Sequence, residues 1–286
     1  MGNKRTPIDS AFVLVFFNHK GGVGKTTNTL TVADALAREK YRVLLIDLDP
    51  QHNSSSLLVP VDANERKTAR QFLTNRKTVI DLLLEPESRA EAILQEAIIP
   101  ETTVPGVSLL PSNLQLATAE NYLRASPVAS PLGYLRRRIR SLLKQYDFIL
   151  IDVSPTLTTL PGNALAAATH LVVPFRGGDY YGLEGFDDLE TYVREIKENE
   201  INPGLELVGA VINGHDRRES AHQAMEERIA ERLPVLATVP RQASVEKAAI
   251  MGRTILGFER SSTAARAYVD FARALLTRLG LRGGVK

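Results

Sequence analysis

The chain has 286 residues, a net charge of +2 at pH 7 and no cysteine, and 44% of its residues are apolar. The absence of cysteine excludes disulfides, iron–sulfur clusters and zinc sites built on thiolates. The five histidines show no metal-ligand spacing, so we expect no metal held by histidine. No apolar run approaches the length of a membrane span, and the short polar N-terminus does not resemble a signal peptide. A cytoplasmic protein is therefore expected.

The charge is unevenly distributed along the chain. Residues 241–286 carry a net charge of +6, whereas the first 240 residues carry −4. A basic C-terminal end on an acidic body favours a polyanionic partner. An ordinary solvated helix face explains the same charges equally well, so both interpretations stay open.

The first predicted elements are a strand, a glycine-rich turn and a helix. An apolar run at 12–17 precedes the turn at 20–27, and a helical pattern follows at 27–38. This is the context of a phosphate-binding loop, in which glycines let backbone amides close around phosphate and a helix N-terminus adds its positive dipole end. The alternative is a glycine turn with two solvated lysines.

The loop predicts specific roles for its residues. Lys25 is expected to reach the β- and γ-phosphates of a nucleotide, and the Thr26 hydroxyl to bind Mg²⁺. Where the general pattern has its first glycine this chain has His19, and a second lysine, Lys20, stands beside it. The residues expected to surround the nucleotide are Gly21, Gly22, Val23, Gly24, Lys25, Thr26 and Thr27.

Further along the chain, apolar runs predict buried strands, and helical patterns separate them. The strands are expected near 42–49, 107–111, 147–152, 171–174, 207–212 and 235–239, and the helical patterns near 54–101, 132–145, 182–198, 217–232 and 262–279. Residues 63–76 are expected to form a surface excursion. In the pattern at 132–145, apolar positions fall on one face and the basic ones, including Arg138, largely off it. The last helix is expected to bury Ala265, Val269, Ala272, Leu275 and Leu276.

Strands that alternate with helices, without a Pro/Gly/Ser linker, predict one α/β domain over 1–286 with tails at 1–10 and 281–286. The expected fold class is a doubly wound, mainly parallel sheet with helices on both faces, as in P-loop proteins. Nucleotide would then lie at the carboxyl ends of the strands.

Three aspartates stand at predicted strand ends: Asp47, Asp49 and Asp152. Phosphoryl transfer to water needs an acid that holds Mg²⁺ and a group that positions the attacking water. Asp152 suits the first role, through the metal's water shell, and Asp49 is a candidate for the second. The alternative is that these residues are polar strand ends that meet solvent.

These stretches together resemble the ParA/MinD family of ATPases over residues 11–280, nearly the whole chain. Residues 20–27 resemble the family's deviant Walker A motif, residues 47–51 its switch I, and residues 147–155 its Walker B and switch II. Residues 163–168, 180–185 and 239–241 resemble later landmarks, which are individually less specific. This sequence departs from the usual family pattern at His52, Ser154 and Asp179, where relatives often have glycine, proline and glutamate.

The resemblance implies further roles. Lys20 would be the signature lysine, which reaches across an ATP-sandwich homodimer to the partner's phosphates, and Asp49 the acid needed for hydrolysis. Asp47, Pro50 and Gln51 would belong to the switch and dimer region. Asn213, Pro240 and Arg241 would lie around the adenine, although Asn213 alternatively caps the next helix.

Within the family, residues 49–51 are similar to the ParA branch. A MinD-like membrane anchor is not expected, because residues 275–281 continue the closing helix. No room for a helix-turn-helix precedes the first strand, so operator binding is not expected either. The resemblance implies a Mg²⁺-dependent ATPase whose ATP dimer binds DNA without sequence preference, on the nucleoid. A ParB-like adaptor, recognised through a short basic N-terminal segment, would stimulate hydrolysis.

The sequence leaves the cargo and the DNA contacts open. Arg253, Arg260 and Arg266 are the expected DNA-binding residues, whereas Arg273 and Arg278 fit a solvated helix face. One alternative function keeps the ATPase but positions a protein cargo on the nucleoid. Another is a MinD-like regulator associated with the membrane, although we expect no stable membrane association.

Overall fold

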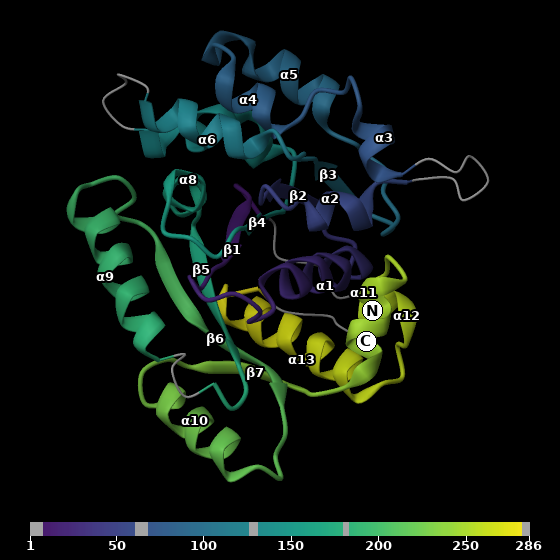
Figure 1. The fold of residues 1–286 in the computed structure, drawn as a ribbon, viewed down its shortest axis with the longest axis vertical. Coiled ribbons are helices and arrows are strands. Elements are labelled where there is room, and N and C mark those ends of the chain that lie inside the picture. The colour runs from purple at the N-terminus through teal and green to yellow at the C-terminus, as the bar shows by residue number, and fades with distance from the viewer. Residues whose placement is uncertain (1–7, 61–67, 126–130, 180–182, 282–286) are drawn as a thin grey trace.

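The computed structural model describes residues 8–60, 68–125, 131–179 and 183–281. Seven parallel strands form one sheet in the order β3-β2-β4-β1-β5-β6-β7 (Figure 1). The strands are β1 (Phe12–Phe16), β2 (Val43–Leu48), β3 (Val107–Leu110), β4 (Phe148–Val153), β5 (His170–Arg176), β6 (Glu206–His215) and β7 (Val235–Pro240). The predicted fold class is confirmed.

Helices cover both faces of this sheet, so its central strands are buried on both sides. The helices are α1 (Lys25–Arg38), α2 (Asn53–Leu58), α3 (Ala69–Leu73), α4 (Val79–Leu84), α5 (Ala90–Ala97), α6 (Leu116–Ala125), α7 (Tyr134–Arg138), α8 (Thr159–Ala167), α9 (Glu184–Glu198), α10 (Ser220–Ala230), α11 (Ala243–Ile250), α12 (Ile255–Phe258) and α13 (Thr263–Arg278). Short 3₁₀ turns are η2 (Glu87–Arg89), η3 (Pro131–Gly133) and η4 (Arg140–Lys144). None of the helices within the described ranges is long and apolar enough to cross a membrane.

Alternation along the strands divides the core into two layers. In β1, Val13 and Val15 point to the layer formed with α4–α10, whereas Leu14 and Phe16 point to the layer formed with α1–α3 and α11–α13. The closing helix α13 packs beside α1 (Figure 1). Both layers bury apolar side chains almost completely, and this burial is the main force that holds the two helices on the sheet.

The segment at 132–145 is not the single helix that its periodicity predicts. It consists of η3, α7 and η4, and the Leu142 amide donates to Ile139 O in a tight turn. The prediction that Arg138 lies off the buried face is also wrong. Arg138 is buried because its guanidinium donates to Glu85 O at 3.0 Å and lies over the Tyr134 ring.

Other helical expectations change in detail. Val269 is only partly buried, because Tyr268 and Phe271 fill the core from α13. Residues 63–67 of the expected surface excursion lie outside the described residues, and the rest contains α3. Helices α6, α11 and α12 have no counterpart among the predicted elements. Of the expected tails, Leu281 packs into the core, and residues 1–7 and 282–286 lie outside the described residues.

The sheet order brings the predicted loop and acids together. Strand β4 lies between β1 and β2, with Asp47 opposite Asp152 and Val13 opposite Ile149 in the register. The carboxyl ends of these three strands therefore meet at one edge of the sheet, next to the N-terminus of α1.

Candidate nucleotide-binding site

The loop between β1 and α1 has the backbone of a phosphate cradle. Gly22 and Gly24 have φ values of +73° and +94°, in the left-handed region that glycine adopts without strain. Gly24 also precedes the first residue of α1, where the Asn28 amide donates to Gly24 O at 2.9 Å. The free amides at this helix N-terminus, together with its dipole, favour an anion.

Lys25 is not a solvated loop lysine. Only 7% of its surface is exposed, and its ammonium donates to Asn18 O at 3.0 Å and Lys20 O at 2.7 Å. Burial lowers the pKa of Lys25 to about 8, and the charges of Asp152 and Asp49 partly oppose this shift. The cation is therefore held by the loop's own carbonyls, beside the place where phosphate is expected.

Asp152, at the end of β4, contacts Thr26 of the phosphate loop. Its two carboxylate oxygens accept hydrogen bonds from Thr26 Oγ1 at 3.2 Å and Ser54 Oγ at 2.7 Å. The side chain is fully buried, and burial, followed by the neighbouring charge of Asp47, raises its pKa. A nearby cation would reverse that shift. The hydroxyl and carboxylate oxygens are the hard donors that Mg²⁺ prefers, so the residues present fit this metal.

Asp47 is also fully buried and supports the segment after β2. Its carboxylate accepts hydrogen bonds from Ser55 N and Ser55 Oγ, both at 2.7 Å, and from the Asp49 amide at 3.1 Å. Burial raises its pKa as well. The structure places Asp47 inside the chain, beneath the predicted switch I, rather than at the surface.

The predicted switch I itself is a tight turn between β2 and α2. Asp49 is nearly buried, and its carboxylate accepts from the Gln51 amide at 2.9 Å. Pro50 is partly buried and Gln51 is exposed. His52 has φ +46° and ψ +36°, a left-handed conformation that costs about 1 kcal/mol or more for a residue with a Cβ. Glycine would adopt this conformation without the cost, which agrees with the glycine that the family resemblance leads us to expect here.

Lys20 forms an ion pair within its own chain. Its ammonium lies 2.5 Å from Asp179 Oδ1, and the two side chains are 35% and 17% exposed. Asp179 follows β5, which pairs with β1 next to the loop. Residues 180–182, part of the landmark that follows Asp179, lie outside the described residues.

A cavity of about 440 Å³ opens beside the phosphate loop. It is lined by loop residues, by the ends of β5, β6 and β7, and by Tyr268 of α13. Asn213, Pro240 and Arg241 all line it, together with Gly22, Gly24, Thr27, Arg176 and Gly177. The cavity is thus continuous with the loop on the side away from Asp152.

Asn213 does not cap a helix, which removes the alternative left open by the sequence. It lies within β6, whereas α10 starts at Ser220. Its Nδ2 donates to Val23 O at 2.8 Å, and a Cβ on Gly24 would lie only 2.9 Å from this nitrogen. The Tyr268 hydroxyl, buried under the loop, lies 2.9 Å from Asn28 Oδ1 and 3.3 Å from Asn213 Oδ1. Asn213 therefore fixes the loop as well as lining the cavity.

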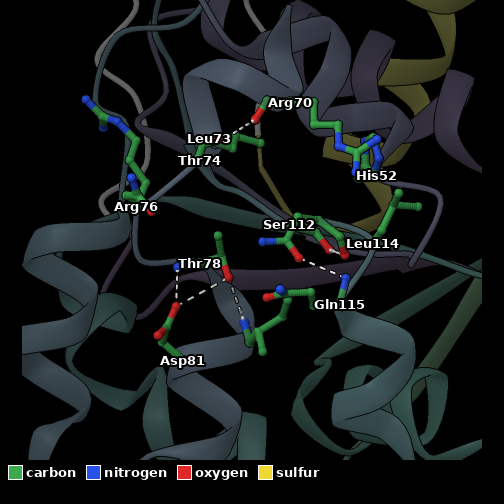
Figure 2. Close-up of a pocket in the computed structure, with 13 residues that line it drawn as sticks. His52, Arg70, Leu73, Thr74, Arg76, Thr78, Asp81, Ser112, Leu114 and Gln115 are labelled. Carbon is green, nitrogen blue, oxygen red and sulfur yellow. Dashed lines mark hydrogen bonds between the residues drawn. The ribbon is translucent and has the colours of Figure 1, made fainter.

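A second cavity of similar size, about 440 Å³, lies beside the predicted switch I and is drawn in Figure 2. His52, Arg70 and Ser112 contribute to its wall. The Ser112 amide donates to Ser55 Oγ at 2.9 Å, which links this wall to Asp47. Its described walls contain no residue of the phosphate loop. The cavity therefore adjoins the predicted switch I and not the phosphate site.

The three predicted DNA-binding arginines are all exposed. Arg253 follows α11, Arg260 follows α12 and Arg266 lies in the first turn of α13. Within the described parts of the chain, their guanidinium groups make no ion pair or side-chain hydrogen bond. By contrast, Arg273 pairs with Asp270 at 2.8 Å, and Arg278 donates to Val208 O at 3.4 Å.

Several residues of the site escaped sequence reasoning. Ser54 and Ser55 hold Asp152 and Asp47, and Arg176 and Tyr268 line the cavity. The run of three serines after the predicted switch I was the one available signal, because hydroxyls next to buried carboxylates satisfy them. Arg176 and Tyr268 approach the loop only through the tertiary fold.

Fold and site together define a P-loop nucleotide-binding protein of the doubly wound α/β class. The AAA domain family matches residues 11–207. The chain is 32% identical over 264 residues to the sporulation initiation inhibitor protein Soj of Bacillus subtilis, covering 91% of this chain and 96% of Soj. It is 30% identical over 271 residues to the chromosome partitioning protein ParA of Caulobacter vibrioides, covering 93% of this chain and 94% of that protein.

Two solved structures have a fold similar to that of this chain. Cobyrinic acid a,c-diamide synthase from Mycobacterium smegmatis, with bound ATP analog and magnesium, has a TM-score of 0.72 and 30% identity, covering 94% of this chain and 96% of that chain. The septum site-determining protein MinD from Pyrococcus horikoshii, complexed with Mg-ADP, has a TM-score of 0.72 at 22% identity, covering 94% and 98%, and supports the fold alone. The chain belongs to the ParA/MinD superfamily of P-loop proteins.

Proposed function

We propose that the protein is a Mg²⁺-dependent ATPase of the ParA type. ATP binding drives formation of a homodimer, and the dimer binds DNA without sequence preference on the nucleoid, in the cytoplasm. A ParB-like adaptor stimulates hydrolysis, and the cycle segregates or positions DNA. The name of one similar protein, the chromosome partitioning protein ParA of Caulobacter vibrioides, supports a role in partition rather than in biosynthesis.

One observation carries the ATPase assignment: Lys25, Thr26 and Asp152 meet at the end of the phosphate loop. Asp152 accepts from Thr26 Oγ1 at 3.2 Å, and its charge partly opposes the burial that lowers the pKa of Lys25. A buried lysine, a hydroxyl and a buried carboxylate next to a helix N-terminus match the chemistry of a triphosphate with its metal. Asp47 supports this arrangement from the neighbouring strand.

The residues divide the work of hydrolysis. Bound Mg²⁺ would be held by Thr26 and, through water, by Asp152, and would neutralise charge on the β- and γ-phosphates. The loop amides and Lys25 bind and orient the phosphates. Asp49 orients the attacking water, and Lys20 of the partner subunit stabilises charge that develops on the transferred phosphate. Lys20 must leave Asp179 to take this role.

Two other functions use the same site. A protein assembly could replace DNA as the cargo on the nucleoid, and nothing in the fold separates this from DNA partition. A MinD-like membrane regulator needs an apolar surface for the membrane, whereas the apolar face of α13 is buried in the core. We favour DNA partition because the similar protein ParA of Caulobacter vibrioides is named a chromosome partitioning protein.

Two substitutions test the ATPase. Lys25→Ala should weaken nucleotide binding itself, because Lys25 contacts phosphate. Asp49→Ala should bind ATP and dimerise but lose on the order of 10²-fold or more in turnover, because it positions water and holds little of the ligand. If Asp49→Ala hydrolyses ATP at the wild-type rate, another acid positions the water, and Asp47 is the first to examine.

The DNA function is tested by binding in three nucleotide states. The wild-type protein should co-sediment with DNA in ATP and not in ADP or without nucleotide. Flotation with anionic liposomes in ATP is the matched test of the membrane alternative. Liposome binding without DNA binding would contradict the proposal.

A further inference from the structure

Arg176 is the last residue of β5, the strand that pairs with β1 on the side away from β4. Its Nη1 lies 4.0 Å from the position that a Cβ on Gly22 would take. Since Gly22 has no side chain, the guanidinium lies against the phosphate loop itself. The backbone after Arg176 is fixed by the Gly177 amide, which donates to Asn213 O at 2.8 Å.

Among the residues that the structure describes, no carboxylate pairs with this guanidinium. Among the described residues, Arg176 makes no ion pair and no side-chain hydrogen bond, although its side chain is exposed toward the cavity beside the loop. Lys20, a cation of the loop itself, is paired with Asp179, which follows β5. An unpaired arginine against a phosphate cradle is suited to a phosphate oxygen, because its planar fork forms two charge-assisted hydrogen bonds.

The position of Arg176 indicates which part of the nucleotide it meets. Gly22, Gly24, Thr27 and Asn213 share its cavity, whereas Thr26, Asp49 and Asp152 do not line that cavity. The transferred phosphate and its metal belong with Thr26 and Asp152, and the base belongs with the other end of the cavity. Because Arg176 shares this cavity with loop residues but not with Thr26 or Asp152, we assign it to the phosphates that remain in ADP.

We propose that Arg176 binds the diphosphate part of the nucleotide held in its own subunit, an inference that rests on the proposed nucleotide-binding function. It acts as a binding and positioning residue and not as a group that stabilises the transition state. Its role thus differs from that of Lys20, which is assigned to the transferred phosphate of the other subunit.

This position predicts a particular kinetic signature. A contact made equally to ADP, ATP and the transition state lowers KM without raising kcat. Arg176→Ala should therefore weaken binding of ADP and of a non-hydrolysed ATP analogue by a similar factor, about 10- to 100-fold. At saturating ATP its kcat should stay within about twofold of the wild type.

The experiment is calorimetric titration with Mg-ADP and with the ATP analogue, followed by steady-state hydrolysis. Four proteins are compared: wild type, Arg176→Ala, Arg176→Lys and Arg124→Ala. Arg124 is an exposed arginine at the end of α6, on a helix that contributes nothing to the described walls of the cavity, so it controls for loss of a surface charge. Arg176→Lys keeps the charge without the fork and should bind with intermediate affinity.

The outcomes separate this inference from the proposed function. If the wild type binds neither ligand, the proposed function fails and the inference with it. If the wild type binds both and Arg176→Ala binds them equally well, only the inference fails. Loss of analogue binding alone, or loss of kcat with unchanged affinity, would place Arg176 at the transferred phosphate and overturn the assignment. Thermal unfolding of each variant verifies that it is folded, and Arg176→Lys provides the test should Arg176→Ala not fold.

Discussion

The Lys20 ammonium lies 2.5 Å from the Asp179 carboxylate of its own chain. A lysine that serves the partner's phosphates must exchange this contact for one across the dimer. Both side chains are partly exposed, and ion pairs of this kind contribute only about 0.2–1 kcal/mol. A phosphate at the dimer interface carries more negative charge than the Asp179 carboxylate and is less accessible to water. It is therefore the stronger partner for the Lys20 ammonium. The pair therefore stabilises one position of Lys20 without preventing the other.

Removing the Asp179 charge should favour the dimer. Asp179→Asn in an Asp49→Ala background, which we expect to arrest turnover, should lower the ATP concentration for half-maximal dimerisation by about two- to fivefold. Sedimentation velocity over an ATP titration measures it. Asp188→Asn is the control, because Asp188 is an exposed carboxylate on α9 near His19, 3.8 Å from its ring. Equal effects of the two substitutions would leave Asp179 with no specific part in dimerisation.

The proposed cross-subunit role of Lys20 is testable by mixing variants. Lys20→Ala should bind nucleotide, because Lys25 and the loop amides remain, but hydrolyse it poorly. Mixed with Asp49→Ala, it should form some dimers in which one site keeps both groups, so that turnover partly recovers. Native mass spectrometry shows whether mixed dimers form. Mixed dimers without recovered turnover would place Lys20 in its own subunit's site.

Much of the site was predictable because it depends on local pattern. The glycine-rich turn after a buried strand fixed the positions of Lys25 and Thr26, and apolar runs ending in acids indicated Asp152 and Asp47. Parallel pairing then brings such strand ends together. Asn213 shows where sequence pattern alone does not decide, because an asparagine after an apolar run is equally suited to capping a helix. Only the approach of β6 to the loop, at 2.8 Å from Val23 O, decides between the two.

The missed features arise from contacts between distant segments. Arg138 reads as a surface residue, but Glu85 O and the Tyr134 ring hold it inside. The segment at 132–145 keeps its predicted apolar face, yet packing against the sheet replaces part of the α-helix with a 3₁₀ turn. Arg176 has no sequence signal, because a single arginine at a strand end is ordinary. Its approach to Gly22 exists only in three dimensions.

The buried carboxylates predict an unusual pH dependence. Burial raises the pKa of Asp152, so the folded protein binds a proton that the unfolded chain releases above about pH 4. Without Mg²⁺ and nucleotide, the contribution of the protonated Asp152 carboxyl to the free energy of unfolding is lost as the pH rises through the raised pKa. Asp152→Asn removes this pH-dependent contribution. It should raise Tm at pH 8 by at least about 2 °C, with little gain at pH 5.

Thermal unfolding in EDTA at pH 5, 6.5 and 8 measures this effect. Glu198→Gln, which removes an exposed carboxylate at the end of α9, should leave the pH dependence unchanged. With Mg²⁺ and the ATP analogue the order should reverse, because a bound cation stabilises the charged carboxylate of the wild type. The same pH dependence in Asp152→Asn and wild type would mean that Asp152 is ionised in the folded protein over this range.

The exposed arginines at the C-terminal end predict how the protein would hold DNA. Arg253, Arg260 and Arg266 are exposed and have no carboxylate partner among the described residues, whereas Arg273 is paired with Asp270. A monomer with a few phosphate contacts binds weakly, and pairing two such surfaces on one duplex strengthens binding through effective concentration. ATP could therefore switch DNA binding by controlling the dimer, without touching the DNA-binding surface.

A salt titration with the ATP analogue tests this on two unrelated duplexes. Each lost phosphate contact should flatten the slope of log affinity against log salt by about 0.9, and weaken both duplexes alike. Arg260→Ala should do so, whereas Arg273→Ala, which removes an arginine already neutralised by Asp270, should change the slope little. Equal slopes for Arg260→Ala and wild type would remove Arg260 from the contact set. A strong preference for one duplex would contradict non-specific binding altogether, because phosphate contacts carry no sequence information.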